Sequence, residues 1–180
     1  GKPRRSCTMK ASMVSQKSVT TLEGLPDATR AQIADCFVQA GGVQCGFCIP
    51  GMVISAKALL DKNLSPTRKE VAQALVGNIC RCTGYQKIFD AILMAAEFFR
   101  EHRKVPEYKT TGRVAEDVFR IDAYAKTLGI GEYVDDMELP DMVYASAVRS
   151  AYPRAIVNDI DASEALAYPG VIAVITAEDI

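Results

Sequence analysis

The chain has 180 residues, with 21 Lys and Arg against 22 Asp and Glu, so its formal net charge is −1. This balance leaves no overall field that could hold nucleic acid or an anionic membrane surface. No apolar run approaches the roughly 18 residues of a membrane-spanning helix, and the basic start at residues 1–5 is not followed by the apolar stretch of a signal peptide. We therefore expect a cytoplasmic protein that binds neither nucleic acid nor a membrane.

Helical patterning begins at Asp27, whose carboxylate can cap a first helix that Gly41 and Gly42 stop. A second helix begins near Pro50, carries apolar residues on one face, and ends at residues 61–63. Both helices have the length and periodicity of amphipathic helices that pack around a shared core.

Two capping boxes mark the starts of a third and a fourth helix. In residues 67–70 (TRKE), the Thr hydroxyl and the Glu carboxylate can satisfy each other's unpaired backbone amides. Residues 83–86 (TGYQ) have the same form and open a helix whose apolar face runs from Tyr85 to Phe99. Pro106 stops this helix, so the helical region ends at about residue 104.

The polar, unperiodic residues 105–119 predict a linker. Beyond it the pattern changes to short apolar runs typical of strands, at residues 142–149, 155–160 and 171–175, with helical turns between 161 and 167. A helix-start signal stands at the very end of the chain, so we expect a fragment that stops inside a domain. The predicted fold class is α plus α/β, with a four-helix domain, a linker and the truncated start of an α/β domain.

Four of the six cysteines form two close pairs, Cys45-x2-Cys48 and Cys80-x-Cys82. Clustered cysteines in an intracellular chain indicate metal or redox chemistry rather than disulfides. Each pair comes just after a helix stop and just before a helix start. Two such units could bring four thiolates together at helix N-termini, where unpaired amides and the positive end of the helix dipole favour anionic sulfur.

Four thiolates can bind a structural zinc ion or an iron–sulfur cluster. Zinc prefers one tetrahedral point, usually reached from two C-x2-C loops, whereas a [2Fe–2S] cluster has two irons, so that each pair could chelate its own iron. The spacing favours the cluster but leaves open a zinc-stabilised interaction domain without redox activity. A dithiol oxidoreductase that uses Cys45 and Cys48 is a third hypothesis, although the motif lacks the preceding strand of a thioredoxin-like unit.

Residues 44–52 (QCGFCIPGM) and 77–85 (GNICRCTGY) closely resemble the second [2Fe–2S] domain of the xanthine dehydrogenase/aldehyde oxidoreductase family of molybdenum hydroxylases. The resemblance covers nearly the whole chain. Residues 7–25 look like the end of the family's plant-type ferredoxin domain. Residues 120–123 and 133–136 look like the start of its molybdopterin-binding subunit.

The resemblance implies four segments along the chain. These are the tail of a ferredoxin-like domain at 1–26, a four-helix [2Fe–2S]-binding domain at 27–104, a linker at 105–119, and the N-terminal part of a hammerhead-like molybdopterin-binding domain at 120–180. Because the last segment ends before the family's catalytic glutamate, we expect no substrate hydroxylation by this chain alone.

The resemblance also implies roles for individual residues. The iron ligands of the [2Fe–2S] cluster would be Cys45, Cys48, Cys80 and Cys82, while Gln44 and Cys82 would contact molybdopterin, which this segment does not fully bind. In the family, this domain relays single electrons from the molybdenum site towards a ferredoxin-like cluster and then to flavin or another acceptor. We accordingly expect an electron-transfer segment of an oxidoreductase. Its partners would be the rest of the hydroxylase and a second copy of the assembly.

Overall fold

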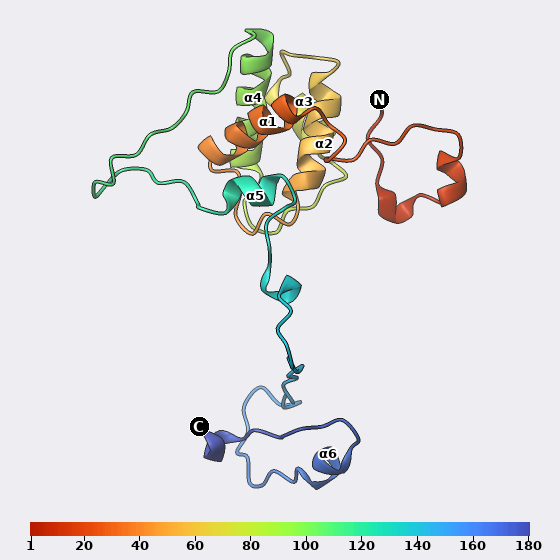
Figure 1. Cartoon of the computed structure of the whole chain (residues 1–180), viewed down its shortest axis with the longest axis vertical. Coiled ribbons are helices and arrows are strands. Elements are labelled where there is room, and N and C mark those ends of the chain that lie inside the picture. Colours follow the sequence, from red (N-terminus) through yellow and green to blue (C-terminus); the bar gives the residue numbers. More distant parts are fainter. The chain divides into compact units, whose positions relative to one another are not determined.

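The computed structural model describes residues 1–180, which divide into two compact units, residues 1–137 and residues 138–180. Helices are the regular secondary structure, and neither unit contains a β-strand. In Figure 1 the first unit holds α1 to α5 and the second holds α6. No helix has both the length and the apolar character that crossing a membrane would require.

Four helices form the body of the first unit, and a fifth, shorter helix packs on them. Their bounds are α1 (Asp27–Gln39), α2 (Ile49–Leu60), α3 (Arg68–Ala74), α4 (Gln86–Arg100) and α5 (Ala123–Thr127). α1 packs against α4, α3 packs against both α2 and α4, and α5 packs against α1 and α2 (Figure 1). The periodicity between residues 27 and 104 thus predicted helices in the places where the structure has them.

The two predicted capping boxes have different outcomes. At α3, the backbone N–H of Glu70 donates to Thr67 Oγ1 at 3.3 Å, and the backbone N–H of Thr67 donates to the Glu70 carboxylate at 2.7 Å, which confirms the first box. The second box, at residues 83–86, does not form. Tyr85 is the N-cap of α4 with φ of +68° and no side-chain cap, because Thr83 Oγ1 accepts a hydrogen bond from the Tyr85 N–H at 3.1 Å instead.

The apolar core lies where helices α1 to α4 of the first unit meet. Its largest fully buried side chains come from all of these helices and include Ile33, Phe37, Met52, Val53, Val71, Ile88 and Ile92. Burying a side chain of this size stabilises the fold by about 1.5–3 kcal/mol. Cys36 is also fully buried in an adjoining cluster, where burial raises the pKa of its thiol to about 12, so it acts as a small apolar residue.

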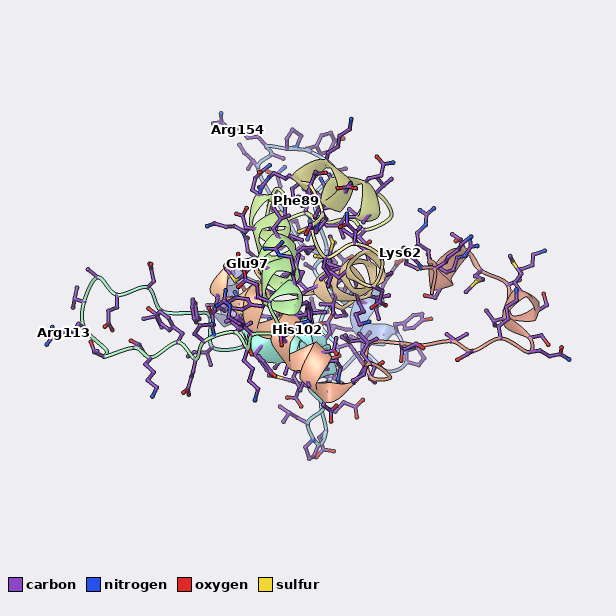
Figure 2. All side chains as sticks on the ribbon, turned by 90° about the horizontal axis from the view of Figure 1, so that it is seen from above. Lys62, Phe89, Glu97, His102, Arg113 and Arg154 are labelled. Atoms are coloured by element: carbon purple, nitrogen blue, oxygen red, sulfur yellow. The ribbon has the colours of Figure 1, made fainter.

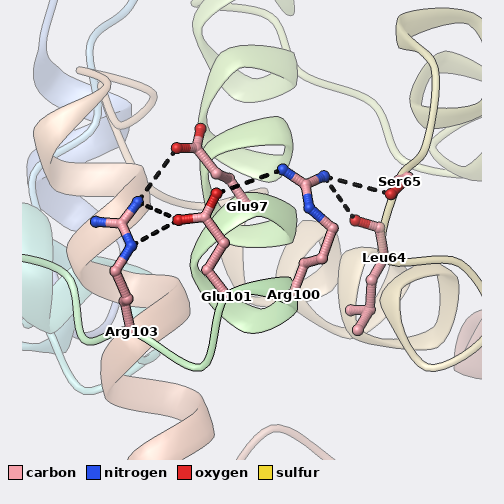
Figure 3. Close-up of polar contacts among 6 residues, drawn as sticks. All are labelled: Leu64, Ser65, Glu97, Arg100, Glu101 and Arg103. Carbon is pink, nitrogen blue, oxygen red and sulfur yellow. Dashed lines mark hydrogen bonds and ion pairs between the residues drawn. The ribbon is translucent and has the colours of Figure 1, made fainter.

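Polar contacts fasten the C-terminal end of α4 to neighbouring segments (Figure 3). Arg100 donates to the backbone oxygen of Leu64 at 3.5 Å and to Oγ of Ser65 at 3.3 Å, which joins α4 to the loop between α2 and α3. Arg103 pairs with Glu97 at 3.3 Å, but both side chains are about half exposed. Such an exposed pair adds only about 0–1 kcal/mol, so the core and not this network holds α4 in place.

Residues 105–119, predicted as a linker, form a loop that closes on itself. The rings of Tyr108 and Phe119 pack with their centroids 4.2 Å apart. Near the tip, the Glu116 carboxylate accepts a hydrogen bond from the backbone N–H of Arg113 at 3.2 Å. Figure 2 shows Arg113 at the far end of this loop, away from the helices. Contacts within the segment therefore give this loop a defined conformation.

Residues 120–137, expected to open the second domain, belong to the first compact unit. They contain α5, which buries Ala123 and Thr127 against its neighbours. The compact helical unit therefore extends beyond residues 27–104. After the loop at 105–119, the chain packs against the helices again through α5.

The strands predicted in the second unit do not form. Residues 142–149, 155–160 and 171–175 are mostly exposed and make no ladder with one another. A strand is stable only when its backbone groups pair with a neighbouring strand, and an apolar run does not by itself supply that neighbour. The helical turns expected between residues 161 and 167 are confirmed as α6 (Ser163–Ala167).

We expect Ile92→Ala to lower the free energy of unfolding by about 2–5 kcal/mol, because it leaves a cavity among fully buried side chains. The matched control is Ile121→Ala, where the side chain that is lost is fully exposed and the effect should stay within about 0.5 kcal/mol. Urea denaturation followed by circular dichroism measures both changes. Equal losses in the two variants would contradict the placement of Ile92 in the core.

Candidate metal centre

The first cysteine loop connects α1 to α2. Cys48 is the N-cap of α2, and its carbonyl accepts the Met52 N–H at 3.1 Å, so its position is fixed by the start of the helix. Gly46 has φ of +85°, a left-handed conformation that favours glycine, and its carbonyl accepts the Ile49 N–H at 3.0 Å. The turn at Gly46 places Cys45 and Cys48 on the same short loop, with two residues between them.

The second cysteine loop connects α3 to α4 and meets the first one. Sγ of Cys82 lies 3.6 Å from Sγ of Cys45, and Cys48 and Cys80 are near enough for each thiol to change the pKa of the other. Each close pair of sulfurs therefore takes one cysteine from each motif. The two loops therefore lie against each other.

The two sulfur pairs differ in exposure. Cys48 and Cys80 are partly buried, whereas Cys45 and Cys82 are exposed, and so is Gln44 beside Cys45. The inner pair lies against the helical core and the outer pair faces outward. No three or more His, Cys, Asp or Glu side chains converge as a ligand group for one metal ion. The donor set is instead two thiol pairs, and a [2Fe–2S] cluster requires two thiolates at each of its two irons.

The environment of each thiol sets its tendency to ionise. Burial, followed by the hydrogen bond to Cys80, raises the pKa of Cys48 to about 12. At Cys80 burial opposes ionisation, but hydrogen bonds from the Thr83 hydroxyl and from backbone amides outweigh it and lower the pKa. Contact with the sulfur of Cys45 raises the pKa of Cys82. Burial thus favours the protonated form of Cys48, whereas hydrogen bonds favour the thiolate form of Cys80.

A network of hydrogen bonds centred on Tyr85 holds the second loop. The backbone N–H of Cys80 donates to Tyr85 Oη at 2.8 Å, and Tyr85 Oη donates to the backbone oxygen of Asn78 at 3.1 Å. Ser55 on α2 donates to Oδ1 of Asn78 at 2.7 Å, which ties the loop to the neighbouring helix. Thr83 Oγ1 lies 3.1 Å from the sulfur of Cys80. These contacts within the protein fix the shape of the loop.

Two family models match the chain. A [2Fe-2S] binding domain matches residues 21–93, and the a/b hammerhead domain of aldehyde oxidase and xanthine dehydrogenase matches residues 128–180. The aldehyde oxidoreductase of Megalodesulfovibrio gigas is 35% identical over 100% of this chain and 21% of its own length. The nicotinate dehydrogenase small FeS subunit of Eubacterium barkeri is 48% identical over 54% of this chain and 62% of that subunit.

A solved structure agrees with these matches. The aldehyde oxidoreductase from Desulfovibrio desulfuricans has a TM-score of 0.64 at 39% identity, covering 73% of this chain and 16% of that chain. The chain belongs to the aldehyde oxidase and xanthine dehydrogenase family of molybdenum hydroxylases. The family resemblance seen in residues 44–52 and 77–85 is thereby confirmed. The chain spans less than two thirds of the length of these relatives.

Sequence reasoning missed two tyrosines of this hydroxylase segment. Tyr85 was assigned to the apolar face of a helix, but its hydroxyl bridges two backbone groups of the second cysteine loop. Tyr133 lies beyond the predicted linker, yet its hydroxyl donates to the backbone oxygen of Cys45 at 2.9 Å. No local pattern in the sequence marks either hydroxyl as a backbone contact.

We expect Tyr85→Phe to reduce the stability of the chain by about 1–3 kcal/mol, because the partly buried N–H of Cys80 loses its acceptor while the ring remains. Thermal unfolding measures the change. The matched control is Tyr144→Phe, which alters a side chain that is 96% exposed and should leave the midpoint unchanged. If both variants unfold like the unaltered chain, the hydroxyl of Tyr85 does not hold the loop.

Proposed function

We propose that Cys45, Cys48, Cys80 and Cys82 hold one [2Fe–2S] cluster, and that the chain relays single electrons within a xanthine dehydrogenase/aldehyde oxidoreductase-like molybdenum hydroxylase. The observation that carries the proposal is the meeting of the two cysteine motifs, with the sulfurs of Cys45 and Cys82 3.6 Å apart. The match to a [2Fe-2S] binding domain across both loops supports it. Each iron would then take one ligand from each motif.

The residues around the sulfurs suit this role. A bound [2Fe–2S] cluster can accept and return one electron, at a potential set by charge, hydrogen bonds to sulfur and solvent exposure. The hydroxyl of Thr83 and the backbone amides near Cys80 stabilise negative charge on the sulfur of Cys80. Packing against the core keeps water from Cys48, whereas the exposed Cys45 and Cys82 leave a short path to a redox partner.

We assign the outward side to molybdopterin. Gln44 and Cys82 are exposed at the same end of the unit, where a pterin could contact both. Electrons would enter there and continue to a ferredoxin-like or flavin acceptor. The partners would be the remainder of the hydroxylase and a second copy of that assembly. We place this assembly in the cytoplasm.

We further propose the domain plan that the family implies. The tail of a ferredoxin-like domain would occupy 1–26, a four-helix [2Fe–2S] domain 27–104, a linker 105–119, and the opening of a hammerhead-like α/β domain 120–180. The match of the a/b hammerhead domain to residues 128–180 supports the last assignment. In the complete enzyme, the apolar runs of that segment would find the strands they need for pairing.

Anaerobic purification followed by an optical spectrum and metal analysis tests the proposal. We expect about two irons and two sulfides per chain, as a single [2Fe–2S] cluster requires, and visible absorption that bleaches when dithionite is added. A colourless protein with stoichiometric zinc, unchanged after attempted cluster reconstitution, would overturn the electron-relay function. That result would leave a zinc-stabilised interaction domain.

Replacing any one of Cys45, Cys48, Cys80 or Cys82 by Ser should abolish the visible absorption and most of the bound iron, because each iron would lose a thiolate. Iron content per chain and circular dichroism are the measurements. Cys7→Ser is the matched control, since Cys7 is exposed and takes no part in the sulfur pairs. Retention of a full cluster after loss of one of the four ligands would contradict the assignment.

A further inference from the structure

Residues 122–133 lie over the first cysteine loop, although they are far from it in the sequence. This segment, here called the clasp, begins at the residue before α5 and ends at Tyr133. We propose that the clasp is part of the cluster site, with Lys126 and Tyr133 as positioning residues that fix the loop at 45–48. The inference rests on the proposed function, because the loop would supply two of the four iron ligands.

The first contact is a hydrogen bond to the backbone of a proposed ligand. Tyr133 Oη donates to the carbonyl oxygen of Cys45 at 2.9 Å, across 88 positions of sequence. A bond to the backbone fixes the peptide plane next to the thiol and leaves the sulfur free. The hydroxyl of Tyr133 therefore orients Cys45 without competing with iron for it.

The second contact is the buried stem of Lys126. Its side chain is only 10% exposed, and its Nζ pairs with Asp122 at 2.9 Å one helical turn earlier. The same Nζ lies 4.6 Å from the centre of the Tyr133 ring, within the range of a cation–π interaction. A charge is kept out of water only where partners of this kind surround it. Lys126 is thus held in one position, with Tyr133 held against it.

The third observation is how closely the loop approaches Lys126. A Cβ added at Gly46 would lie 2.5 Å from Cβ of Lys126, and one added at Gly131 would lie 2.7 Å from its Cγ. The lysine stem therefore runs between two glycines, one on the cysteine loop and one on the clasp. The loop has no room to move inward, and its carbonyl bond to Tyr133 restrains it from moving outward.

These contacts explain how Cys45 is held in position, which the helices alone do not. α2 fixes Cys48 as its N-cap, but Cys45 precedes the turn at Gly46 and is exposed. Without the clasp, the outer sulfur of the first loop would depend on a flexible glycine for its position. With it, the separation of Cys45 from Cys82 is set by residues from three parts of the chain.

Tyr133→Phe tests the hydrogen bond, because it keeps the ring over Lys126 and removes only the hydroxyl. In the full chain, we expect iron loss to a chelator to become about two- to tenfold faster, the range that one hydrogen bond provides. We also expect faster hydrogen–deuterium exchange in peptides that contain residues 45–48. Tyr144→Phe is the matched control and should change neither rate.

Gly46→Ala tests the close approach. It should prevent full cluster assembly, because the added methyl group would overlap the stem of Lys126. Gly112→Ala controls for backbone strain: Gly112 has φ of +75°, close to the +85° of Gly46, but a Cβ there would meet nothing within 4 Å. Iron per chain should fall at least twofold in the first variant and remain unchanged in the second.

The outcomes separate the clasp from the cluster proposal. If the unaltered chain assembles a [2Fe–2S] cluster and Tyr133→Phe matches Tyr144→Phe in iron loss and in exchange, the clasp has no positioning role. If the unaltered chain takes up no cluster, the proposed function fails. Exchange at residues 45–48 then still decides whether Tyr133 restrains the loop, since that measurement needs no iron.

Discussion

The candidate metal centre depends on the contact between the two cysteine loops. Sγ of Cys82 and Sγ of Cys45 lie 3.6 Å apart although they belong to different motifs. That contact requires the start of α2 and the start of α4 to lie at the same end of the helical unit, which the packing of α3 against both helices provides. The buried core is therefore the support that sets the sulfur geometry.

Both loops are held by tyrosine hydroxyls that bind backbone groups rather than sulfur. Tyr85 accepts the N–H of Cys80, and Tyr133 donates to the carbonyl of Cys45. A phenol can do either, and its rigid ring fixes the oxygen at a set distance from its own backbone. The tyrosines therefore hold the loops in shape without occupying the sulfurs, which stay free to bind metal. One tyrosine comes from within the helical domain and the other from beyond it, so the site is built by more of the chain than its cysteines suggest.

Sequence patterns were informative wherever one local interaction decides the structure. Thr67 and Glu70 form the predicted capping box because both partners lie within one helical turn. The same pattern at residues 83–86 does not form a capping box. The Thr83 hydroxyl contacts the sulfur of Cys80 and accepts the N–H of Tyr85 instead. The clasp was not predictable, since a contact across 88 positions leaves no periodic trace. The strands expected in residues 142–175 failed for a related reason, because their stability depends on partners that no local pattern encodes.

The inner and outer sulfurs differ in exposure, so the site has a side that faces the core and a side that faces outward. Cys48 is partly buried and burial raises the pKa of its thiol to about 12, so in the absence of metal it stays protonated at neutral pH. Ionising it requires a partner that stabilises the thiolate more than water does, which a metal ion supplies. Cys82 and Cys45, by contrast, are exposed. Binding of iron would thus anchor the cluster at its core side and leave its exposed edge facing a neighbouring redox group. The hydrogen bond from Tyr133 in the clasp would hold Cys45 in position at that edge.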